Sequence, residues 1–244
     1  MKLLLLDVGN SRLKWAGADA SGLRPGGAVE HGGNPAAAVS GIGEESVDAI
    51  WIANVTGAAL GDKLAAVLKL RYGATPRFAA VQGQCAGLRA AYAEPQRLGI
   101  DRWLCLLAAW SETRGSACVA SAGTALTFDA VDAQGQHLGG VIAPGLVTMQ
   151  QAVLGATRFA ASGPAQDYSA GLGRDTDSCV RQGALHAGAG LVERLAARYG
   201  KDARCLLTGG DAGRLLPHLG GDWKLRPNLV MEGLLAYARS AAQA

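Results

Sequence analysis

Short apolar runs alternate with polar, glycine-rich turns along this chain. The first run spans Leu3 to Val8, carries an aspartate at position 7 and ends at Gly9-Asn10-Ser11. A comparable run, Ala117 to Ala122, ends at Gly123-Thr124. Runs of this length bounded by turn residues predict buried strands, and a glycine turn leaves backbone N–H groups free to face an anion. We interpret both turns as candidate phosphate-binding loops.

The similarity between the two runs continues beyond the turns. Residues 7–10 lie 114 positions before residues 121–124, and the matches that follow are spaced by 113, so one single-residue gap reconciles them. Chance matching among 35 glycines is one explanation. The other is a duplicated unit of hairpin-linked strands, each copy offering one phosphate loop. The later matches pair Asp19 with Asp132, Gly22 with Gly135, and Gly26-Gly27 with Gly139-Gly140.

The periodicity predicts the same order of elements twice, with three strands followed by alternating helices and strands. This order predicts an α/β protein of two domains, 1–114 and 115–244, each with a mixed sheet covered by helices. In the first half we expect strands at 2–8, 11–17, 27–31, 47–54 and 77–81, and helices at 57–72 and 98–113. In the second half we expect strands at 116–121, 125–132, 137–143 and 204–208, and helices at 145–156, 175–199, 211–217 and 231–242.

Composition narrows the function classes. Apolar residues make up 49% of the chain and charged residues 18%, which is typical of a well-buried protein. The net charge of +3 is small and dispersed, which argues against a nucleic-acid partner. Leu3 to Leu6 is shorter than the ~7–15 apolar residues of a signal sequence, and no run approaches the ~20 of a membrane span. We expect a cytoplasmic protein without a membrane partner.

Cysteine and histidine give no sign of a metal site. The five cysteines are widely spaced without a C-x-x-C pair, so we expect buried thiols rather than disulfides or zinc ligands. The four histidines form no H-x-x-H pattern. A transition-metal site built from protein ligands is therefore not expected.

Six ordered motifs, spread from Met1 to about Gly233, resemble those of the type III pantothenate kinases. The resemblance implies duplicated ribonuclease H-like domains of the actin-like ATPase superfamily, with ATP in a cleft between the halves. It also implies phosphorylation of pantothenate by ATP, the first step of coenzyme A biosynthesis. The motifs are Asp7-Val8-Gly9-Asn10-Ser11 with Lys14, Gly99-Ile100-Asp101-Arg102-Trp103, Gly123-Thr124-Ala125, Gly139-Gly140 with Pro144-Gly145, Gly173-Arg174-Asp175-Thr176, and Thr208-Gly209-Gly210-Asp211.

By this resemblance, the first loop binds ATP. Asp7 would orient Mg²⁺ or another divalent cation, and Lys14 would neutralise phosphate charge. A solvated carboxylate at a strand end is the simpler interpretation of Asp7. The full set of ATP-binding residues that the resemblance implies is Asp7, Val8, Gly9, Asn10, Ser11, Arg12, Leu13, Lys14 and Thr124.

The resemblance also assigns the acceptor side of the reaction. Asp101 matches the catalytic base, and the substrate-binding residues are Tyr92, Gly99, Ile100, Asp101, Arg102 and Thr176. Simpler roles remain open: an acid at a helix N-terminus beside a surface arginine for Asp101-Arg102, a packed aromatic for Tyr92, and a helix N-cap for Thr176. Residues 208–211 match the nucleoside region, but Gly-Gly turns have many structural uses.

One position departs from the family pattern. Ser121 stands where many relatives carry an aspartate that helps to hold a monovalent cation such as K⁺ or NH₄⁺. A hydroxyl is a poorer ligand for a cation than a carboxylate. The substitution argues against a requirement for a monovalent cation, unless a carboxylate elsewhere, such as Asp129, replaces the missing ligand.

Family members are usually homodimers, and we expect one here. Ala184, Gly188 and Leu191 recur at near-helical spacing and would lie on the dimer face, with packing inside one copy as the alternative. Two other functions compete with pantothenate kinase. A different small-alcohol kinase would explain the phosphate loops but not the match at residues 99–103. A non-catalytic regulatory protein would predict damage at Asp7, Asp101 or Thr124, and none is seen.

Overall fold

The structure is a computed structural model that describes residues 1–34, 36–43, 46–158 and 167–242. Its contacts divide the chain into two compact units. Unit 1 comprises Met1–Glu112 and Asn228–Ala244, and unit 2 comprises Thr113–Pro227. The final helix, α6 (Leu229–Ala241), belongs by its contacts to unit 1, whereas the sequence analysis counted it with the second half.

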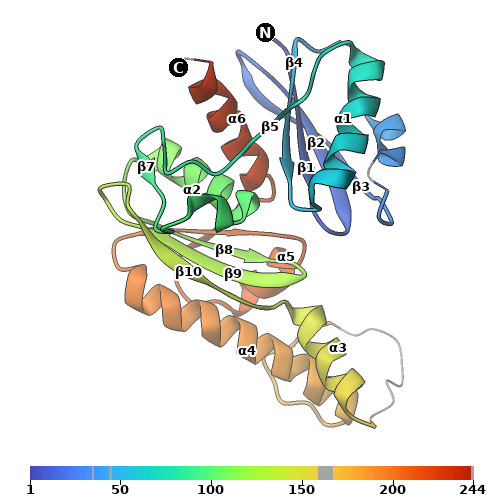
Figure 1. Ribbon diagram of the computed structural model, residues 1–244. Coiled ribbons are helices and arrows are strands. Elements are labelled where there is room, and N and C mark those ends of the chain that lie inside the picture. The colour runs from blue at the N-terminus through green and yellow to red at the C-terminus, as the bar shows by residue number, and fades with distance from the viewer. Residues whose placement is uncertain (35, 44–45, 159–166, 243–244) are drawn as a thin grey trace. The chain divides into compact units, whose positions relative to one another are not determined.

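Unit 1 is a five-stranded mixed sheet with helices on both faces (Figure 1). Its strand order is β3-β2-β1-β4-β5, in which β1 pairs antiparallel with β2 and parallel with β4. The strands are β1 (Leu3–Val8), β2 (Arg12–Asp19), β3 (Gly22–Glu30), β4 (Ala49–Asn54) and β5 (Arg77–Phe78). The helices are η1 (Ala37–Gly41), α1 (Ala58–Tyr72), η2 (Pro95–Arg97), α2 (Ile100–Thr113) and α6, and β6 (Gln84–Cys85) with β7 (Leu88–Arg89) forms a small hairpin.

The side chains of β1 alternate between the two faces of this sheet. Successive strand residues point to opposite faces. Leu4, Leu6 and Val8 join the core cluster beneath α1, which contributes Leu64 and Leu68. Leu3, Leu5 and Asp7 therefore point to the opposite face, on the side where α6 packs against β1 and β4. The strand thus places one carboxylate on an otherwise apolar buried face.

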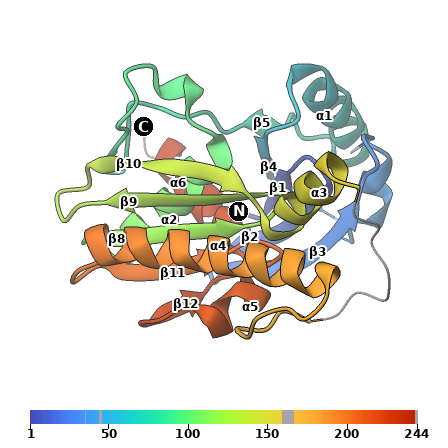
Figure 2. The same ribbon diagram turned by 90° about the horizontal axis from the view of Figure 1, so that it is seen from below.

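Unit 2 repeats this topology. Its strand order is β10-β9-β8-β11-β12, and the long helix α4 lies across one face (Figure 2). Cys118, Ala120 and Ala122 of β8 pack on the same core cluster as Leu185 and Val192 of α4. The elements are β8 (Ala117–Ala122), β9 (Ala125–Val131), β10 (His137–Pro144), α3 (Leu146–Ala156), α4 (Thr176–Tyr199), β11 (Arg204–Thr208), α5 (Ala212–Leu215), η3 (Leu216–His218) and β12 (Trp223–Leu225).

The duplication predicted from the sequence is confirmed by the two strand orders, and the single-residue gap lies in the turns. In unit 1, the N–H of Gly9 donates to the carbonyl of Arg12 at 3.0 Å. In unit 2, the N–H of Gly123 donates to the carbonyl of Ala125, also at 3.0 Å. The second turn is one residue shorter, which changes the offset between the copies from 114 to 113.

Several elements differ from the sequence expectation, among them η1 and the β6–β7 hairpin, which were not predicted. Strand β3 begins at Gly22 rather than at residue 27. Gly26 and Gly27 lie inside the strand, where the indole of Trp15 packs directly over them and leaves no space for side chains. Strand β5 has two residues rather than five. Strand β12 was not predicted, although its Trp223 is buried in the core of unit 2. No helix in the described part of the chain is long and apolar enough to cross a membrane.

The predicted dimer face on α4, the stripe formed by Ala184, Gly188 and Leu191, is wrong, because these residues pack inside unit 2. Ala184 is buried, and Leu191 packs against the core of unit 2. A Cβ at Gly188 would lie 2.9 Å from Cδ2 of Leu146 and 3.4 Å from Cδ2 of Leu126. This stripe is therefore occupied by α3 and β9 of the same unit.

Helix α6 approaches α2 so closely that Gly233 tolerates no side chain. A Cβ at Gly233 would lie 1.9 Å from the carbonyl oxygen of Leu104. We expect Gly233→Ala to lower the free energy of unfolding by about 2 kcal/mol or more, because the two backbones must separate. Urea unfolding followed by tryptophan fluorescence measures this change.

The matched control is Gly190→Ala on the exposed side of α4, where a Cβ meets nothing within 4 Å. This change should leave stability unchanged or raise it by up to ~1 kcal/mol, since alanine favours a helix over glycine. Equal urea midpoints for the two variants would contradict the close contact between α2 and α6.

Candidate functional site

The first glycine turn brings two charged residues of the predicted loop together. Strands β1 and β2 pair so that Asp7 lies directly opposite Lys14. Asp7 is only 9% exposed, whereas Asn10 and Ser11 at the tip of the turn are exposed. The turn therefore offers polar groups to solvent while its aspartate sits beneath them.

The burial of Asp7 has an electrostatic cost. Desolvation raises the pKa of Asp7 from 3.8 to about 6, against the lowering effect of Lys14. The nearby charge of Asp101 raises it further. Lys14 and Asp101 both act on Asp7 within unit 1, so the structure groups these three predicted site residues. A solvated strand-end carboxylate, the simpler interpretation of Asp7, is wrong.

Asp101 is the second residue of α2, where a helix N-terminus favours negative charge. Gly99 directly precedes the helix, and its carbonyl accepts the N–H of Trp103 at 3.0 Å. Oδ1 of Asp101 accepts the N–H of Arg102 at 2.9 Å. A Cβ at Gly99 would lie 2.7 Å from this same oxygen, so glycine at position 99 leaves room for the carboxylate of Asp101.

Arg102 and Tyr92 form a second polar pair in unit 1. Nη1 of Arg102 donates to the hydroxyl of Tyr92 at 3.2 Å, and Arg102 is buried. The segment before Tyr92 is fixed on α2, because Nε1 of Trp110 donates to the carbonyl of Ala86 at 3.0 Å. Arg102 is therefore not a surface arginine, and Tyr92 has a specific polar contact in addition to its packing.

His31 supports the first turn, and sequence reasoning missed it. Its Nε2 lies 2.8 Å from the carbonyl oxygen of Gly9, and the N–H of Gly33 donates to Nδ1 at 3.1 Å. Because Nδ1 accepts, the proton of the neutral ring is on Nε2, which donates to Gly9. The backbone N–H of His31 also donates to Ser11 at 3.2 Å. Only its place just after β3 hints at this role.

Three residues of the predicted set have apolar side chains. Val8 and Leu13 are fully buried in the core beneath α1, and Ile100 is buried on α2. Any contact they make with a ligand is through the backbone. Arg12, in contrast, is exposed at the start of β2.

The second turn, in unit 2, is enclosed by glycines. Thr124 is exposed, and its carbonyl accepts the N–H of Gly145 at 2.9 Å and the hydroxyl of Thr148 at 2.7 Å. A Cβ at Gly145 would lie 1.8 Å from the carbonyl oxygen of Gly123. Gly209 has a φ of +100°, and its Cβ would lie 2.1 Å from the carbonyl oxygen of Ala122. The Thr208–Asp211 motif therefore packs directly against the end of β8.

Thr176 is the first residue of α4, and its predicted alternative role is wrong. The helix N-cap is Asp175, whose side chain accepts the N–H of Ser178 at 2.9 Å in a capping box. Thr176 is exposed and lines an apolar groove of about 930 Å³ between α3 and α4. Met149, Val153 and Val180 are among its other lining residues.

The structure bears on two candidate cation sites. Ser121 lies on β8 opposite Thr127 and Thr208, so hydroxyl side chains occupy its two neighbouring strands. The described residues contain no group of three or more His, Cys, Asp or Glu side chains that could hold a metal. A divalent cation near Asp7 would thus have to share its coordination with substrate and water, as Mg²⁺ commonly does.

Comparison with known proteins gives the same family as the resemblance of the sequence motifs. The model of a family described as type III pantothenate kinase matches residues 3–198. The chain belongs to this family. A type III pantothenate kinase from Nitrosococcus oceani is 34% identical, covering 99% of this chain and 95% of the relative. The family match identifies the chain as a kinase.

Solved structures support the fold. A conserved putative Baf family transcriptional activator from Campylobacter jejuni gives a TM-score of 0.62 at 18% identity, covering 99% of this chain and 100% of the other. The activator of 2-hydroxyisocaproyl-CoA dehydratase from Clostridium difficile, solved with bound ADPNP, gives 0.56 at 10% identity and covers 100% and 97%. At sequence identities this low, the similarity shows the fold alone. Together with the two matching strand orders, it confirms the expected architecture of duplicated ribonuclease H-like domains.

The pKa of Asp7 predicts a dependence of stability on pH. Since this pKa is higher in the folded protein than in the unfolded chain, folding favours the protonated carboxyl. The resulting stabilisation is fully present below about pH 4 and is lost as the pH rises through about 6. Asp7→Asn carries no charge, so at about pH 8 it should be more stable than the parent by up to about 3 kcal/mol.

Urea unfolding of the parent and of Asp7→Asn across this pH range measures the difference. It should shrink towards zero near about pH 4. A stability difference that stays constant with pH would mean that the burial of the Asp7 charge does not cost the folded protein free energy.

Proposed function

We propose that this kinase transfers the γ-phosphoryl group of ATP to the terminal hydroxyl of pantothenate, giving ADP and 4′-phosphopantothenate at the first step of coenzyme A biosynthesis. The observation that carries the proposal is the grouping of Asp7, Lys14 and Asp101 beside the first glycine turn. The family membership supports the substrate, and the protein would act in the cytoplasm.

The first turn would hold the phosphates. Gly9 allows close backbone approach, Asn10 and Ser11 present exposed polar side chains, and Lys14 supplies positive charge. A divalent cation such as Mg²⁺, held by Asp7 together with water and phosphate oxygens, would neutralise charge on the transferred group. The donor set fits this ion, because a bound cation offsets the cost of burying the ionised Asp7.

Asp101 would act as the catalytic base. A carboxylate is too weak a base to remove the proton of a primary alcohol before phosphoryl transfer begins. Asp101 would therefore first align the hydroxyl by accepting its hydrogen bond. It would take the proton late, as the bond from the acceptor oxygen to phosphorus forms and the bond to ADP breaks.

Arg102 and Tyr92 would bind pantothenate on the same unit. Pantothenate carries a carboxylate, and a guanidinium is the side chain best suited to pair with one. Burial of Arg102 strengthens such a pair by limiting solvent screening. Thr176 and Thr124 belong to unit 2, where Thr176 lines the apolar groove beside α4, and their roles in binding substrate and ATP stay predictions.

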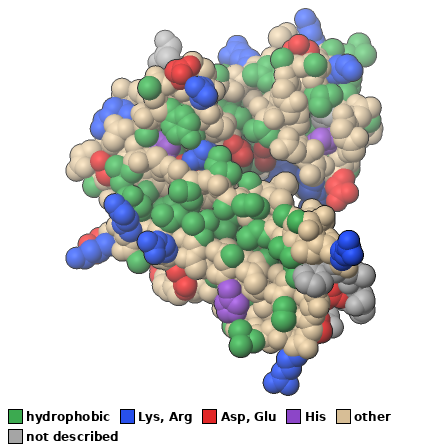
Figure 3. All heavy atoms as spheres, turned by 60° about the horizontal axis from the view of Figure 1, so that its bottom comes forward, with side chains coloured by type: hydrophobic (Ala, Val, Ile, Leu, Met, Phe, Trp, Pro, Cys, Tyr) green, Lys and Arg blue, Asp and Glu red, His purple; other side chains and the backbone are tan. Residues whose placement is uncertain are grey.

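The proposal includes a homodimer, built on a face other than the α4 stripe. Exposed apolar side chains of unit 2 include Leu138 and Ile142 on β10 and Val147 and Val153 on α3. Hydrophobic side chains gather on the side of unit 2 where β10 and α4 lie (Figure 3). β10 is also an edge strand of its sheet. A second copy covering these residues would remove an exposed apolar patch and a sheet edge.

Asp101→Asn tests the base. The substitution is nearly isosteric at a partly exposed position, so the protein should fold normally. We expect kcat to fall at least about tenfold, a barrier increase of ~1.4 kcal/mol, with little change in KM. A coupled assay of ADP release measures kcat and KM of the variant with pantothenate. Repeating the assay with a panel of other small alcohols shows which acceptor the enzyme prefers.

Asp62→Asn on the exposed side of α1 is the control and should retain parental kcat. Parental turnover by Asp101→Asn would remove Asp101 from the role of base. Faster ADP release with another alcohol than with pantothenate would instead favour a different small-alcohol kinase.

His31 provides a second test, through the shape of the first turn. Asn at position 31 keeps an acceptor near the place of Nδ1 for Gly33 but loses the donor to Gly9, whereas Gln keeps a donor near the place of Nε2. We expect His31→Asn to raise the KM for ATP about tenfold, a loss of ~1.4 kcal/mol, and leave the KM for pantothenate unchanged. His31→Gln should stay close to the parent.

Steady-state kinetics of the two variants distinguish positioning from folding. A merely structural role would affect both substrates alike and follow the melting temperatures. Equal KM values for ATP in the Asn and Gln variants would show that the bond to Gly9 does not shape the ATP loop.

The monovalent cation is the subject of a third test. With Ser121 in place of a carboxylate, the initial rate should change less than about twofold when KCl replaces tetramethylammonium chloride at constant ionic strength. Ser121→Asp restores the formal charge and should make the rate respond to K⁺. Steep, saturable activation of the parent would show that other groups hold the ion.

A further inference from the structure

Two cysteines of unit 2 lie side by side on neighbouring strands. Cys118 of β8 and Cys205 of β11 are direct partners in the parallel register. Partners in this position project to the same face, and both cysteines pack in the core cluster beneath α4. Adjacent strands lie about 4.8 Å apart, within the ~4.4–6.8 Å that disulfides span between Cα atoms. The backbone therefore holds the Cα atoms of the two cysteines within the range that a disulfide spans.

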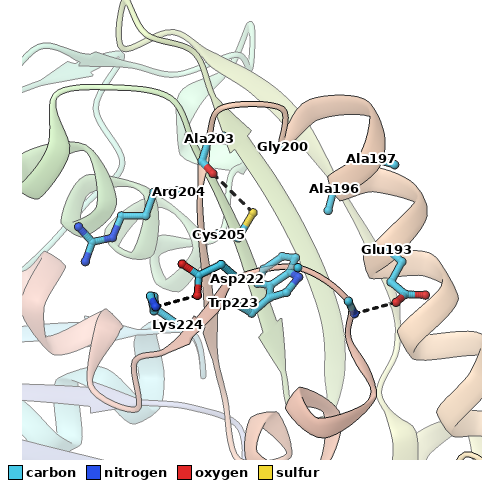
Figure 4. Close-up of a pocket in the computed structure, with 12 residues that line it drawn as sticks. Glu193, Ala196, Ala197, Gly200, Ala203, Arg204, Cys205, Asp222, Trp223 and Lys224 are labelled. Carbon is cyan, nitrogen blue, oxygen red and sulfur yellow. Dashed lines mark hydrogen bonds and ion pairs between the residues drawn. The ribbon is translucent and has the colours of Figure 1, made fainter.

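The two thiols differ in their access to solvent. Cys118 is fully buried, whereas Cys205 is partly exposed and lines an open cavity of about 640 Å³. Figure 4 shows Cys205 on the wall of this cavity with Trp223 beside it, and its sulfur donates to the carbonyl of Ala203 at 3.8 Å. A small solute entering the cavity reaches Cys205 first and finds Cys118 behind it.

The two thiols also differ in acidity. A hydrogen bond between the two sulfurs raises the pKa of Cys118 and lowers that of Cys205. Desolvation and the nearby Asp222 oppose the lowering at Cys205. The more acidic thiol is therefore the one that faces the cavity. An accessible thiolate backed by a second cysteine is the arrangement typical of redox-responsive proteins.

We propose that Cys205 and Cys118 form a peroxide-responsive thiol pair, in which Cys205 reacts with hydrogen peroxide and Cys118 resolves the product to a reversible disulfide. The Cys205 thiolate attacks one peroxide oxygen, the O–O bond breaks, and the departing hydroxide takes up a proton to form water. Cys118 then attacks the sulfur of the resulting sulfenic acid. The S–S bond forms, the S–O bond breaks, and the hydroxyl leaves as water with the Cys118 proton.

This chemistry balances and is independent of phosphoryl transfer. Two thiols lose two electrons in total, and one peroxide is reduced to two waters. A thiol reductant reverses the reaction by exchange. The two strands that the pair would join lead into the Gly123 and Gly209 turns, and both cysteines lie near the start of their strands, at the end opposite to those turns.

The test is peptide mapping of the full chain after exposure to peroxide. The reduced protein is treated with a small molar excess of hydrogen peroxide, its remaining thiols are alkylated under denaturing conditions, and peptides are identified by mass spectrometry. We expect a cross-linked peptide joining Cys118 to Cys205, with the mass of two hydrogen atoms lost, that disappears after dithiothreitol. Cys179, which is exposed on α4, should not take part in the cross-link.

Three variants make the result decisive. Cys205→Ser should give no cross-link, Cys118→Ala should accumulate a sulfenic acid at Cys205 that dimedone traps, and Cys179→Ser should behave as the parent. If Cys118→Ala does not fold, the parent peptide map still decides. Full alkylation of Cys118 and Cys205 after peroxide, or a cross-link of Cys205 to any other cysteine, would overturn the proposal.

Discussion

The burial of one carboxylate at the end of β1 is the constraint on which the candidate site depends. Asp7 lies on an apolar face of the unit 1 sheet, opposite Lys14 and within reach of the charge of Asp101. Burial outweighs the help of Lys14, so the pKa of Asp7 rises to about 6. A protein selected for stability alone would place an apolar residue here. Such a cost is typical of a site that keeps a charge for chemistry.

The surroundings of Asp7 are arranged to tolerate this charge. The glycine turn that follows Asp7 is held in place by His31, which bonds to the carbonyl of Gly9 and to the N–H of Gly33 in the loop after β3. Helix α2 places Asp101 at its N-terminus, and the hairpin anchored by Trp110 brings Tyr92 to Arg102. Asp101 and Arg102 thus depend on one helix, and Asp7 and Lys14 on one hairpin of the same unit. Unit 2 repeats the hairpin but carries Ser121 where unit 1 has Asp7.

Much of this fold could be predicted from the sequence because buried strands leave a strong local signal. Leu3 to Val8 and Ala117 to Ala122 are each bounded by a glycine turn, and their repeat fixed the order of elements. The start of β3 could not be predicted, since Gly26 and Gly27 look like a turn until the ring of Trp15 is seen to cover them. Strand β12 is too short for a periodic signal, and its Trp223 is buried only through tertiary packing.

The site shows the same division between local motifs and distant contacts. Asp7, Lys14 and Asp101 were found because they sit in motifs, and their roles remain proposals. His31 was missed because the two bonds that tie it to the first turn, to Gly9 and Ser11, join residues about twenty positions apart in the chain. The α4 stripe was misassigned because Gly188 and Leu191 give the same spacing whether they face a second copy or, as here, Leu146 and the core of the same unit.

The central proposal is that Asp7 is partly protonated at about pH 6 and loses its proton when a divalent cation and the phosphates bind beside it. Isothermal titration calorimetry of magnesium-ATP binding in buffers of different ionisation enthalpy measures this directly, with Asp7→Asn as the reference for protons released by the nucleotide itself. At about pH 6 the parent should release about half a proton more than the variant, and the excess should vanish near pH 8. Equal proton release by the two proteins at about pH 6 would contradict the account.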